Sequence, residues 1–284
     1  MDVSGNTQSF GVLGHPVKHT LSPPMHNAAL QRMGRDAVYL PYDVEPEHVL
    51  KVLESMRHMG FGGVNLTIPH KEVAFSGLAD LAESARLVGA VNTVEFTEDG
   101  LVGHSTDGYG IVQAILEGFD TPVRGAHIAV VGCGGAGRSI ALVCATEGAR
   151  AITLWNRNRE RAETVAAEIR RVAPHVLVDI AENDLAGLSL AEIVIQSTSL
   201  GMKPDDESPV SREVLRPGQK VIDTIYVFEE TAIMREARAA GAQAINGLGM
   251  LLHQGVQSLR IWTGEDPPVE VMREALRRAV YEKE

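Results

Sequence analysis

A glycine-rich turn between an apolar strand and a helix constrains the fold of this chain most strongly. Residues 130–143 read VVGCGGAGRSIALV, in which Gly132, Gly134 and Gly137 have GxGxxG spacing after an expected strand and at the start of an expected helix. The first glycine permits a tight turn, the second lets the backbone approach a pyrophosphate, and the third lets helix and strand pack closely. Because the helix N-terminus then faces the anion, the pattern predicts a dinucleotide site. A glycine-rich turn without a ligand is the alternative.

The segment from residue 108 to 246 has a sequence pattern typical of a parallel sheet. Apolar runs alternate in it with amphipathic helical stretches, which predicts a Rossmann-type, doubly wound α/β domain that binds a dinucleotide. The expected strands are residues 126–132, 151–156, 176–180, 192–198, 220–226 and 242–246. At 284 residues the chain is also long enough for a second domain with its own core.

The residues outside this segment predict a smaller α/β domain. Its expected elements are strands at 9–14, 37–44 and 62–68 and a hairpin that turns at Asp99–Gly100. Ser22 precedes two prolines, which predicts a helix that Ser22 caps. The stretches 247–264 and 267–281 are too long and too apolar for a tail, so we expect them to pack on this domain. The smaller domain is therefore expected to be discontinuous, with residues 1–107 and 247–284.

The overall charge argues against polyanionic partners. With a net charge of -11 and no Lys/Arg run, the chain would repel phosphate backbones and anionic lipids, so we expect no nucleic acid and no membrane partner. The start is not signal-like, and Cys133 and Cys144 are too few for a disulfide framework, which predicts a cytoplasmic protein. His15, His19 and His26 lack the spacing of metal ligands, so we expect no metal.

The end of the strand expected at 151–156 indicates which dinucleotide binds. An NAD enzyme usually places Asp or Glu there, about 20 residues beyond the glycines, to hold the ribose 2'-hydroxyl. This chain has Asn156 and Arg157, with Arg159 and Arg161 close by. Because the planar guanidinium group matches the geometry and charge of a phosphate, we expect these residues to bind a 2'-phosphate, which favours NADP over NAD. At least one arginine, most simply Arg159, is expected to be only a solvated helix start.

Lys71 follows a predicted buried strand, where an unpaired ammonium is costly. It stands two residues past Pro69 in GGVNLTIPHKE. Hydride transfer to a carbonyl needs a proton donor beside the oxygen, and the reverse reaction needs a base. Partial burial would make the Lys71 proton easier to transfer, and Asp107, at the junction of the expected domains, is the candidate partner. The alternatives are a surface lysine at a helix start and an aspartate that only caps the next helix.

Eight segments in order resemble the signature segments of the shikimate dehydrogenase family and its quinate-using relatives. They span residues from about 10 to 265 and read GHPVKHTLSPPMHN, NLTIPHK, GAVNT, STDGYG, VGCGGAGRS, WNRNRERA, STSLGM and GMLLHQG. The resemblance implies an oxidoreductase that reversibly reduces 3-dehydroshikimate to shikimate with NADPH, in the chorismate pathway to aromatic amino acids. It also implies that Lys71 and Asp107 are the catalytic pair.

The same resemblance implies two sets of binding residues and a monomer or homodimer. The substrate set places Thr20, Ser22 and Tyr226 at the carboxylate and Asn65, Thr67, Asn92 and Gln254 at the ring hydroxyls. The cofactor set is Gly132, Gly134, Gly135, Ala136, Gly137, Asn156, Arg157, Asn158, Arg161, Thr198, Gly201, Met202 and Gly247. Simpler alternatives exist for four of the substrate residues. Ser22 could only cap its helix, Thr67 could be a strand residue chosen for β-propensity, Asn92 could only bond the local backbone, and Gln254 could face solvent.

Three departures from the usual family segments leave the specificity open. Thr20 stands where serine is usual and adds a methyl group beside the expected carboxylate, NLT replaces NVT at residues 65–67, and Asn158 replaces a hydroxyl near the cofactor phosphate. Shikimate, quinate and an amino analogue therefore remain possible substrates. The rival interpretations are a quinate dehydrogenase that uses NAD or NADP and a non-catalytic dinucleotide sensor, which would not need Lys71 and Asp107.

Overall fold

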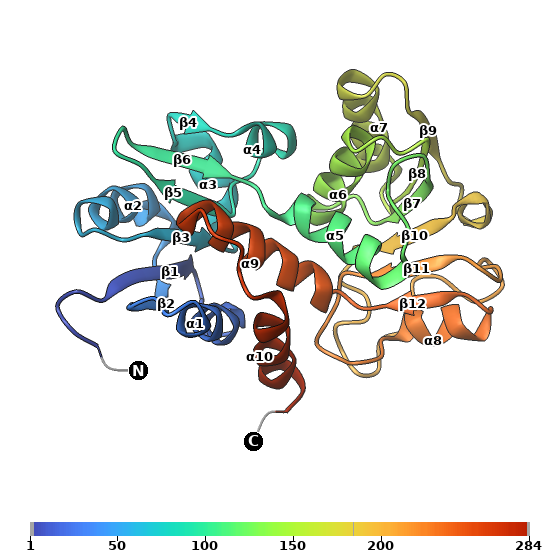
Figure 1. The fold of residues 1–284 in the computed structure, drawn as a ribbon. Coiled ribbons are helices and arrows are strands. Elements are labelled where there is room, and N and C mark those ends of the chain that lie inside the picture. The colour runs from blue at the N-terminus through green and yellow to red at the C-terminus, as the bar shows by residue number, and fades with distance from the viewer. Residues whose placement is uncertain (1–2, 184, 283–284) are drawn as a thin grey trace. The chain divides into compact units, whose positions relative to one another are not determined.

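The chain divides into two compact units, which a computed structural model describes over residues 3–183 and 185–282 (Figure 1). One unit comprises the chain up to Gly110 together with the chain from Leu252, and the other is Ile111–Leu251. The divisions fall inside helices α5 (Asp107–Phe119) and α9 (Leu248–Thr263), a few residues beyond the expected starts of these helices. Sequence patterns indicate where a helix begins. They do not indicate where a continuous helix passes from one unit to the other.

The sheet of the first unit is mixed and has the order β2-β1-β3-β5-β6-β4. Its strands are β1 (Gln8–Gly14), β2 (Ala37–Asp43), β3 (Gly63–Leu66), β4 (Asp80–Leu81), β5 (Thr93–Phe96) and β6 (Leu101–His104). β1 pairs in parallel with β2 and β3, whereas β5 and β6 are antiparallel neighbours on either side of Asp99 and Gly100, which confirms the predicted hairpin.

The helices of the first unit cover a core of aliphatic side chains. They are α1 (Ser22–Arg32), the 3-10 turn η1 (Pro46–His48), α2 (Val49–His58), α3 (His70–Gly77), α4 (Glu83–Val88) and α10 (Val269–Tyr281). Leu13, Leu53, Val64 and Val94 are fully buried in this core. Leu53 belongs to α2, where apolar residues recur at helical spacing, and the other three lie on buried strands. α10 packs against α1, as the apolar C-terminal stretch predicted.

The second unit is a parallel sheet of order β12-β11-β10-β7-β8-β9, flanked by helices. Its elements are β7 (His127–Val131), α6 (Gly135–Thr146), β8 (Ala151–Trp155), α7 (Arg159–Val172), β9 (Leu177–Ile180), η2 (Ala186–Leu190), β10 (Ile193–Gln196), β11 (Lys220–Asp223), α8 (Ala232–Ala239) and β12 (Gln243–Ile245). The strand order reverses between β7 and β10, and ligands of such sheets bind at the carboxyl ends beside this switch point. The predicted α/β class with a Rossmann-type sheet is confirmed.

Two local features of these units differ from the sequence predictions. The run at 220–226 is a strand only as far as Asp223, because the chain turns there. Ser22 does not cap α1: the helix begins at Ser22 itself, Leu21 occupies the N-cap position, and no side-chain cap hydrogen bond forms. In the described part of the chain, no helix is long and apolar enough to cross a membrane.

Candidate active site

Lys71 and Asp107 form an ion pair in the first unit. Lys71 lies in the first turn of α3, shortly after β3, and Asp107 is the first residue of α5. Lys71 Nζ is 2.6 Å from Asp107 Oδ2, and 31% and 26% of the two side chains remain exposed. The ammonium after Pro69 therefore has a counter-charge at hydrogen-bond distance. A partly shielded yet accessible ammonium of this kind can exchange a proton with a bound molecule.

Asn92 fixes the orientation of the Asp107 carboxylate. Its Nδ2 donates to Asp107 Oδ1 at 2.9 Å, so both carboxylate oxygens accept a hydrogen bond. Its Oδ1 accepts from the backbone N–H of Thr106 at 2.8 Å, which assigns the amide orientation because a backbone N–H only donates. The same Nδ2 lies 3.3 Å from Gln254 Oε1. Asn92 is 3% exposed and bonds groups far along the chain, so it does more than close a local turn.

A buried set of hydroxyl and amide groups continues from Asn92 to β3 and α9. Asn65 Nδ2 lies 2.9 Å from Ser258 Oγ and 3.1 Å from Thr93 Oγ1, both of which can accept from it. The Thr93 and Ser258 hydroxyls are 2.8 Å apart, and the Ser258 hydroxyl donates to the carbonyl of Gln254 at 3.0 Å. Gln254 is buried with them, so the alternative of a solvent-facing glutamine is wrong. Three predicted substrate residues thus lie in one connected polar set with the ion pair.

Tyr39 of β2 also belongs to this set. Its hydroxyl donates to Asn65 Oδ1 at 2.8 Å and is fully buried. Burial raises the pKa of Tyr39 well above its ordinary value, and a hydrogen bond with Ser22 opposes this shift. The hydroxyl therefore keeps its proton and acts as a donor. Thr20 lies beside Ser22, whose backbone N–H donates to Thr20 Oγ1 at 3.4 Å.

Sequence reasoning did not identify Tyr39, Thr93 or Ser258. The available signals were weak. Ser258 is one helical turn beyond Gln254 and so shares its face, Thr93 follows Asn92 directly, and a tyrosine in a buried strand needs a partner for its hydroxyl. None of these signals names the partner.

Thr67 lies outside this connected set. It follows β3 and is half-buried, and its N–H donates to the carbonyl of Leu13 at 2.9 Å. A Cβ placed on Gly14 would lie 2.6 Å from the Thr67 methyl group, so the glycine makes room for this side chain. In the described part of the chain, no hydrogen bond joins Thr67 to Asn65 or Asn92. Thr67 Oγ1 can therefore still bond a ligand.

The glycine loop of the second unit follows β7 and opens α6. Gly132 has φ +100°, which favours glycine, and a Cβ on Gly137 would lie 1.8 Å from the Gly132 carbonyl oxygen. A Cβ on Gly134 or Gly135 would instead meet nothing within 4 Å, and Ala136 beside them is exposed. The loop is therefore tight on its inner side and open where the N–H groups of α6 begin. This arrangement fits a pyrophosphate.

Asn156 ties the glycine loop to the loop after β8. Its Oδ1 accepts from the N–H of Cys133 at 2.9 Å, and its Nδ2 donates to the carbonyl of Asn158 at 2.8 Å. Asn158 caps α7, because its Oδ1 accepts from the N–H of Glu160 at 3.0 Å. The cap uses the oxygen of the Asn158 amide and leaves its Nδ2 as a potential donor to a phosphate.

The arginines at the start of α7 fall into two kinds. Arg159 pairs with Glu163 and Glu182, both at 3.2 Å, as expected of a solvated helix start. Arg157 and Arg161 are exposed, and among the described residues no carboxylate forms an ion pair with either. Their charges are therefore available to an anion at the end of β8, which fits a 2'-phosphate.

Four further predicted residues of the second unit lie on loops after β10 and β11. Thr198, Gly201 and Met202 follow β10, and the Gly201 N–H donates to Asp206 Oδ2 at 2.9 Å. Tyr226 follows β11 and is half-buried, which raises the pKa of its hydroxyl. Tyr226 belongs to Ile111–Leu251, whereas the other predicted substrate residues belong to the first unit.

Gly247 precedes α9 and packs closely on the chain after β11. Its N–H donates to the carbonyl of Ile225 at 3.0 Å, and a Cβ there would lie 2.2 Å from the Thr224 carbonyl oxygen. Only glycine fits this close approach.

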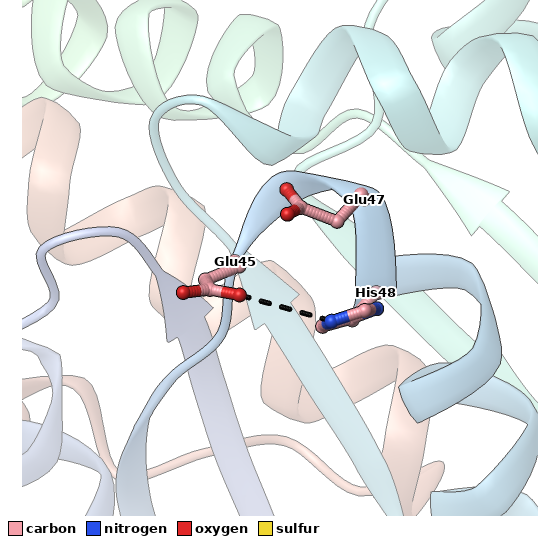
Figure 2. A group of neighbouring side chains, drawn as sticks. All are labelled: Glu45, Glu47 and His48. Atoms are coloured by element: carbon pink, nitrogen blue, oxygen red, sulfur yellow. Dashed lines mark ion pairs between the residues drawn. The ribbon is translucent and has the colours of Figure 1, made fainter.

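Glu45, Glu47 and His48 form the one group of ligand-type side chains that the described residues bring together (Figure 2). All three are exposed on and beside η1, and Glu45 pairs with His48 at 3.7 Å. The three histidines weighed in the sequence lie elsewhere: His15 pairs with Asp43 at 2.7 Å, and His26 stacks on Tyr39. Burial lowers the pKa of His26 to about 3. An exposed acidic group of this kind needs no ion.

Three segments of the chain match families of known proteins. Residues 12–94 match the shikimate dehydrogenase substrate binding domain, residues 113–211 match shikimate / quinate 5-dehydrogenase, and residues 247–277 match the shikimate 5'-dehydrogenase C-terminal domain. The chain is 39% identical over 281 residues to shikimate dehydrogenase (NADP(+)) of Methanothermobacter thermautotrophicus, which covers 98% of this chain and 99% of that protein.

Solved structures agree with these matches. Shikimate 5-dehydrogenase from Thermus thermophilus, in complex with NADP(H) and shikimate, is 36% identical with a TM-score of 0.86 and covers 96% of this chain and 100% of its own. Quinate dehydrogenase from Corynebacterium glutamicum, in complex with NAD, is 28% identical with a TM-score of 0.86 and covers 95% and 98%. This chain belongs to the shikimate dehydrogenase family.

Proposed function

We propose that this chain catalyses the reversible, NADP-dependent reduction of 3-dehydroshikimate to shikimate. The observation that carries the proposal is the Lys71–Asp107 pair, with 2.6 Å between Nζ and Oδ2 and with Asn92 on the second carboxylate oxygen. The nearly full-length similarity to a shikimate dehydrogenase (NADP(+)) supports the choice of substrate and cofactor.

Lys71 and Asp107 would share the proton chemistry. Bound NADPH would supply a hydride to the carbonyl carbon of the substrate. The Lys71 ammonium would donate a proton to the carbonyl oxygen, which becomes the hydroxyl of shikimate, and in the reverse direction neutral Lys71 would accept that proton. Asp107 would hold the Lys71 amine in place through their 2.6 Å contact. Asn92 would keep Asp107 in this orientation.

The connected polar set of the first unit suits a small, highly hydroxylated acid. We assign Thr20 and Ser22, with Tyr226, to the substrate carboxylate. We assign the ring hydroxyls to Asn65, Thr67, Asn92 and Gln254. A site of hydrogen-bonding side chains rejects an analogue that lacks one hydroxyl by up to about 10⁴ to 10⁵ fold, because buried groups would be left unpaired.

The second unit would hold the dinucleotide. We assign the pyrophosphate to the loop from Gly132 to Gly137 and the 2'-phosphate to Arg157, Asn158 and Arg161. The other end of the dinucleotide would be held by the loops that contain Thr198, Gly201, Met202 and Gly247. The first unit would then be the substrate-binding and catalytic domain and the second the dinucleotide-binding domain.

A spectrophotometric scan tests the proposal directly. The purified chain would be assayed for reduction of NADP and of NAD with shikimate, quinate and aminoshikimate. We expect the highest kcat/KM for shikimate with NADP. A higher kcat/KM for quinate or for NAD would contradict the assigned preference, and no activity on any of the three acids would contradict the assigned reaction.

A quinate dehydrogenase is the second candidate function. The similarity to a quinate dehydrogenase bound to NAD favours it, and the extra methyl group of Thr20 leaves the choice between the two acids open. The same scan separates the two candidates, because a quinate enzyme would give its highest kcat/KM with quinate. NADPH binding without turnover of any polyol acid would point instead to a dinucleotide sensor, which the Lys71–Asp107 pair argues against.

We further propose a cytoplasmic monomer or homodimer. Cys133 and Cys144 are both buried and free. Burial raises their pKa values to about 11 and about 12, so both thiols stay protonated and unreactive at neutral pH. Sedimentation of the purified chain decides between the two assembly states, and fractionation of the source cells tests the location.

A further inference from the structure

The strand ends of β10 and β11 hold two buried polar side chains that the proposed chemistry does not use. Gln196 ends β10 and is fully buried, and Asp223 ends β11 and is 1% exposed. The two residues are opposite each other in the parallel register. Burying a carboxylate without a cation is costly. This cost calls for a role that an apolar residue could not fill.

Asp223 fixes the turn that follows β11. Its Oδ1 accepts from the N–H of Ile225 at 3.0 Å, which is the turn that an aspartate makes with the backbone two residues on. The carbonyl of Ile225 in turn accepts from the N–H of Gly247 at 3.0 Å. The chain at Ile225 is therefore held on both sides, and Tyr226 follows it directly.

Gln196 fixes the loop that follows β10. Its Nε2 donates to the carbonyls of Thr198 and Leu200 at 3.2 and 3.0 Å, and its Oε1 accepts from the N–H of Thr198. A hollow of about 140 Å³, lined in part by Gly201 and Thr231, lies beside this loop.

The side chain of Gln196 also acts on the carboxylate of Asp223. Burial raises the pKa of Asp223 to about 6, while the N–H of Ile225 and the side chains of Thr231 and Gln196 lower it. Thr231 lies near the carboxylate, although its buried hydroxyl makes no hydrogen bond of normal geometry in the described part of the chain. The two strand ends therefore form one polar unit that shapes both loops.

The position of these loops in the sheet indicates which end of a dinucleotide they would meet. In the order β11-β10-β7-β8, the glycine loop follows β7 and the arginines follow β8. A dinucleotide with its pyrophosphate at β7 and its 2'-phosphate at β8 extends its nicotinamide over β10 and β11. The loops are also coupled directly, because the Ser197 hydroxyl donates to the Gly132 carbonyl at 2.8 Å.

We propose that Asp223, together with Gln196, is a positioning residue for the nicotinamide end of the dinucleotide. The pair shapes the loops at residues 197–202 and 224–226 without touching the cofactor. This inference rests on the proposed NADP function of the second unit, and it assigns to buried side chains a specific part in cofactor affinity.

NADPH titration of variants of the full chain tests this inference, with nucleotide fluorescence as the readout. Asp223→Asn keeps an acceptor for the Ile225 N–H and should bind NADPH within about threefold of wild type. Asp223→Ala leaves that N–H unpaired and should weaken NADPH binding by about tenfold or more. Equal NADPH affinity in wild type and Asp223→Ala would overturn the inference, as would equal losses in both variants.

Thr153→Val provides a matched control in the same unit. Thr153 lies within β8, and its buried hydroxyl bonds the ring of His127, which begins β7, at 2.8 Å. This variant should lower the melting temperature yet keep NADPH affinity, which separates positioning from general destabilisation. A matching loss of affinity would overturn the inference.

Gln196→Met keeps the experiment decisive if Asp223→Ala does not fold. Methionine has a similar size but cannot hold the carbonyls of Thr198 and Leu200, so NADPH binding should again weaken by about tenfold. Unchanged affinity in this variant would overturn the inference. Failure of the proposed NADP binding, on which this inference rests, is distinguishable, because wild type itself would then not bind NADPH.

Discussion

The polar site of the first unit and the glycine loop of the second are built in opposite ways. In the first unit, Lys71, Asn92, Asp107 and Gln254 come from separate segments and reach one another through their side chains. In the second, residues 132–137 are contiguous and offer backbone N–H groups beside open space. Substitutions that remove side-chain atoms should therefore abolish the function of the first site, whereas substitutions that add a side chain to a glycine should impair the second.

The largest expected effect is on the side-chain site. Lys71→Ala removes the proposed proton donor and should lower kcat by at least about 10² fold, the lower limit for a general acid–base group. NADPH affinity should stay near wild type, because the glycine loop is untouched. Steady-state kinetics and NADPH titration measure the two quantities. Lys51→Ala, an exposed lysine on α2, is the control and should change neither; wild-type kcat in Lys71→Ala would remove this lysine from the mechanism.

A second prediction concerns the buried carboxylate of Asp223 at the end of β11 in the second unit. Because the Asp223 pKa is raised from 3.8 to about 6, the folded chain binds more protons than the unfolded chain between these values. This group therefore favours the folded state as pH falls through that window, and its ionised form costs up to about 3 kcal/mol at neutral pH. Asp223→Asn should remove this dependence.

Denaturant unfolding of wild type and Asp223→Asn across this pH range measures the effect. The stability difference between the two proteins should be largest above about pH 6 and shrink toward about pH 4. Parallel stability profiles would show that Asp223 does not titrate as described.

Added atoms should damage the glycine loop in two distinguishable ways. Gly137→Ala places a Cβ 1.8 Å from the Gly132 carbonyl oxygen, so the backbone must shift, at a cost of about 1 to 3 kcal/mol in stability. NADPH affinity should fall by about tenfold with it. Gly135→Ala meets nothing within 4 Å in the protein and should weaken only the binding of NADPH. Melting curves and titrations of both variants check this, and an equally destabilised Gly135→Ala would contradict the open-face assignment.

The smallest expected effect is on cofactor choice. Arg157→Ala should lower the ratio of kcat/KM with NADP to that with NAD by about fivefold to tenfold, because one charge-assisted hydrogen bond to the 2'-phosphate is lost. Arg159→Ala is the matched control: its side chain already pairs with Glu163 and Glu182, so the ratio should not change. A larger change in the control than in Arg157→Ala would reverse the assignment of the two arginines.

The comparison also explains what the sequence could predict. The backbone-built loop is local, so its glycines, strand and helix were readable from residues 130–143 alone. Lys71 and Asp107 were paired from chemistry and from the ordered family segments, and the structure places them 2.6 Å apart.

The supporting residues were harder to predict because their partners come from other segments. Tyr39, Thr93 and Ser258 look like ordinary strand and helix residues until tertiary packing brings their hydroxyls together. Asp223 was hidden in a run expected to be strand throughout, since nothing local marks the turn that its side chain makes. Ser22 was expected to cap its helix, but it is the first residue of α1 and no side-chain cap hydrogen bond forms.

The central claim is that the Lys71 amine transfers a proton to or from the oxygen on the carbon where hydride is transferred. A crystal structure of the chain with shikimate and NADP bound tests it most directly. The account predicts Lys71 Nζ within about 3 Å of the shikimate hydroxyl oxygen on the carbon that faces the nicotinamide ring. Shikimate bound with that oxygen out of reach of Lys71 would contradict it.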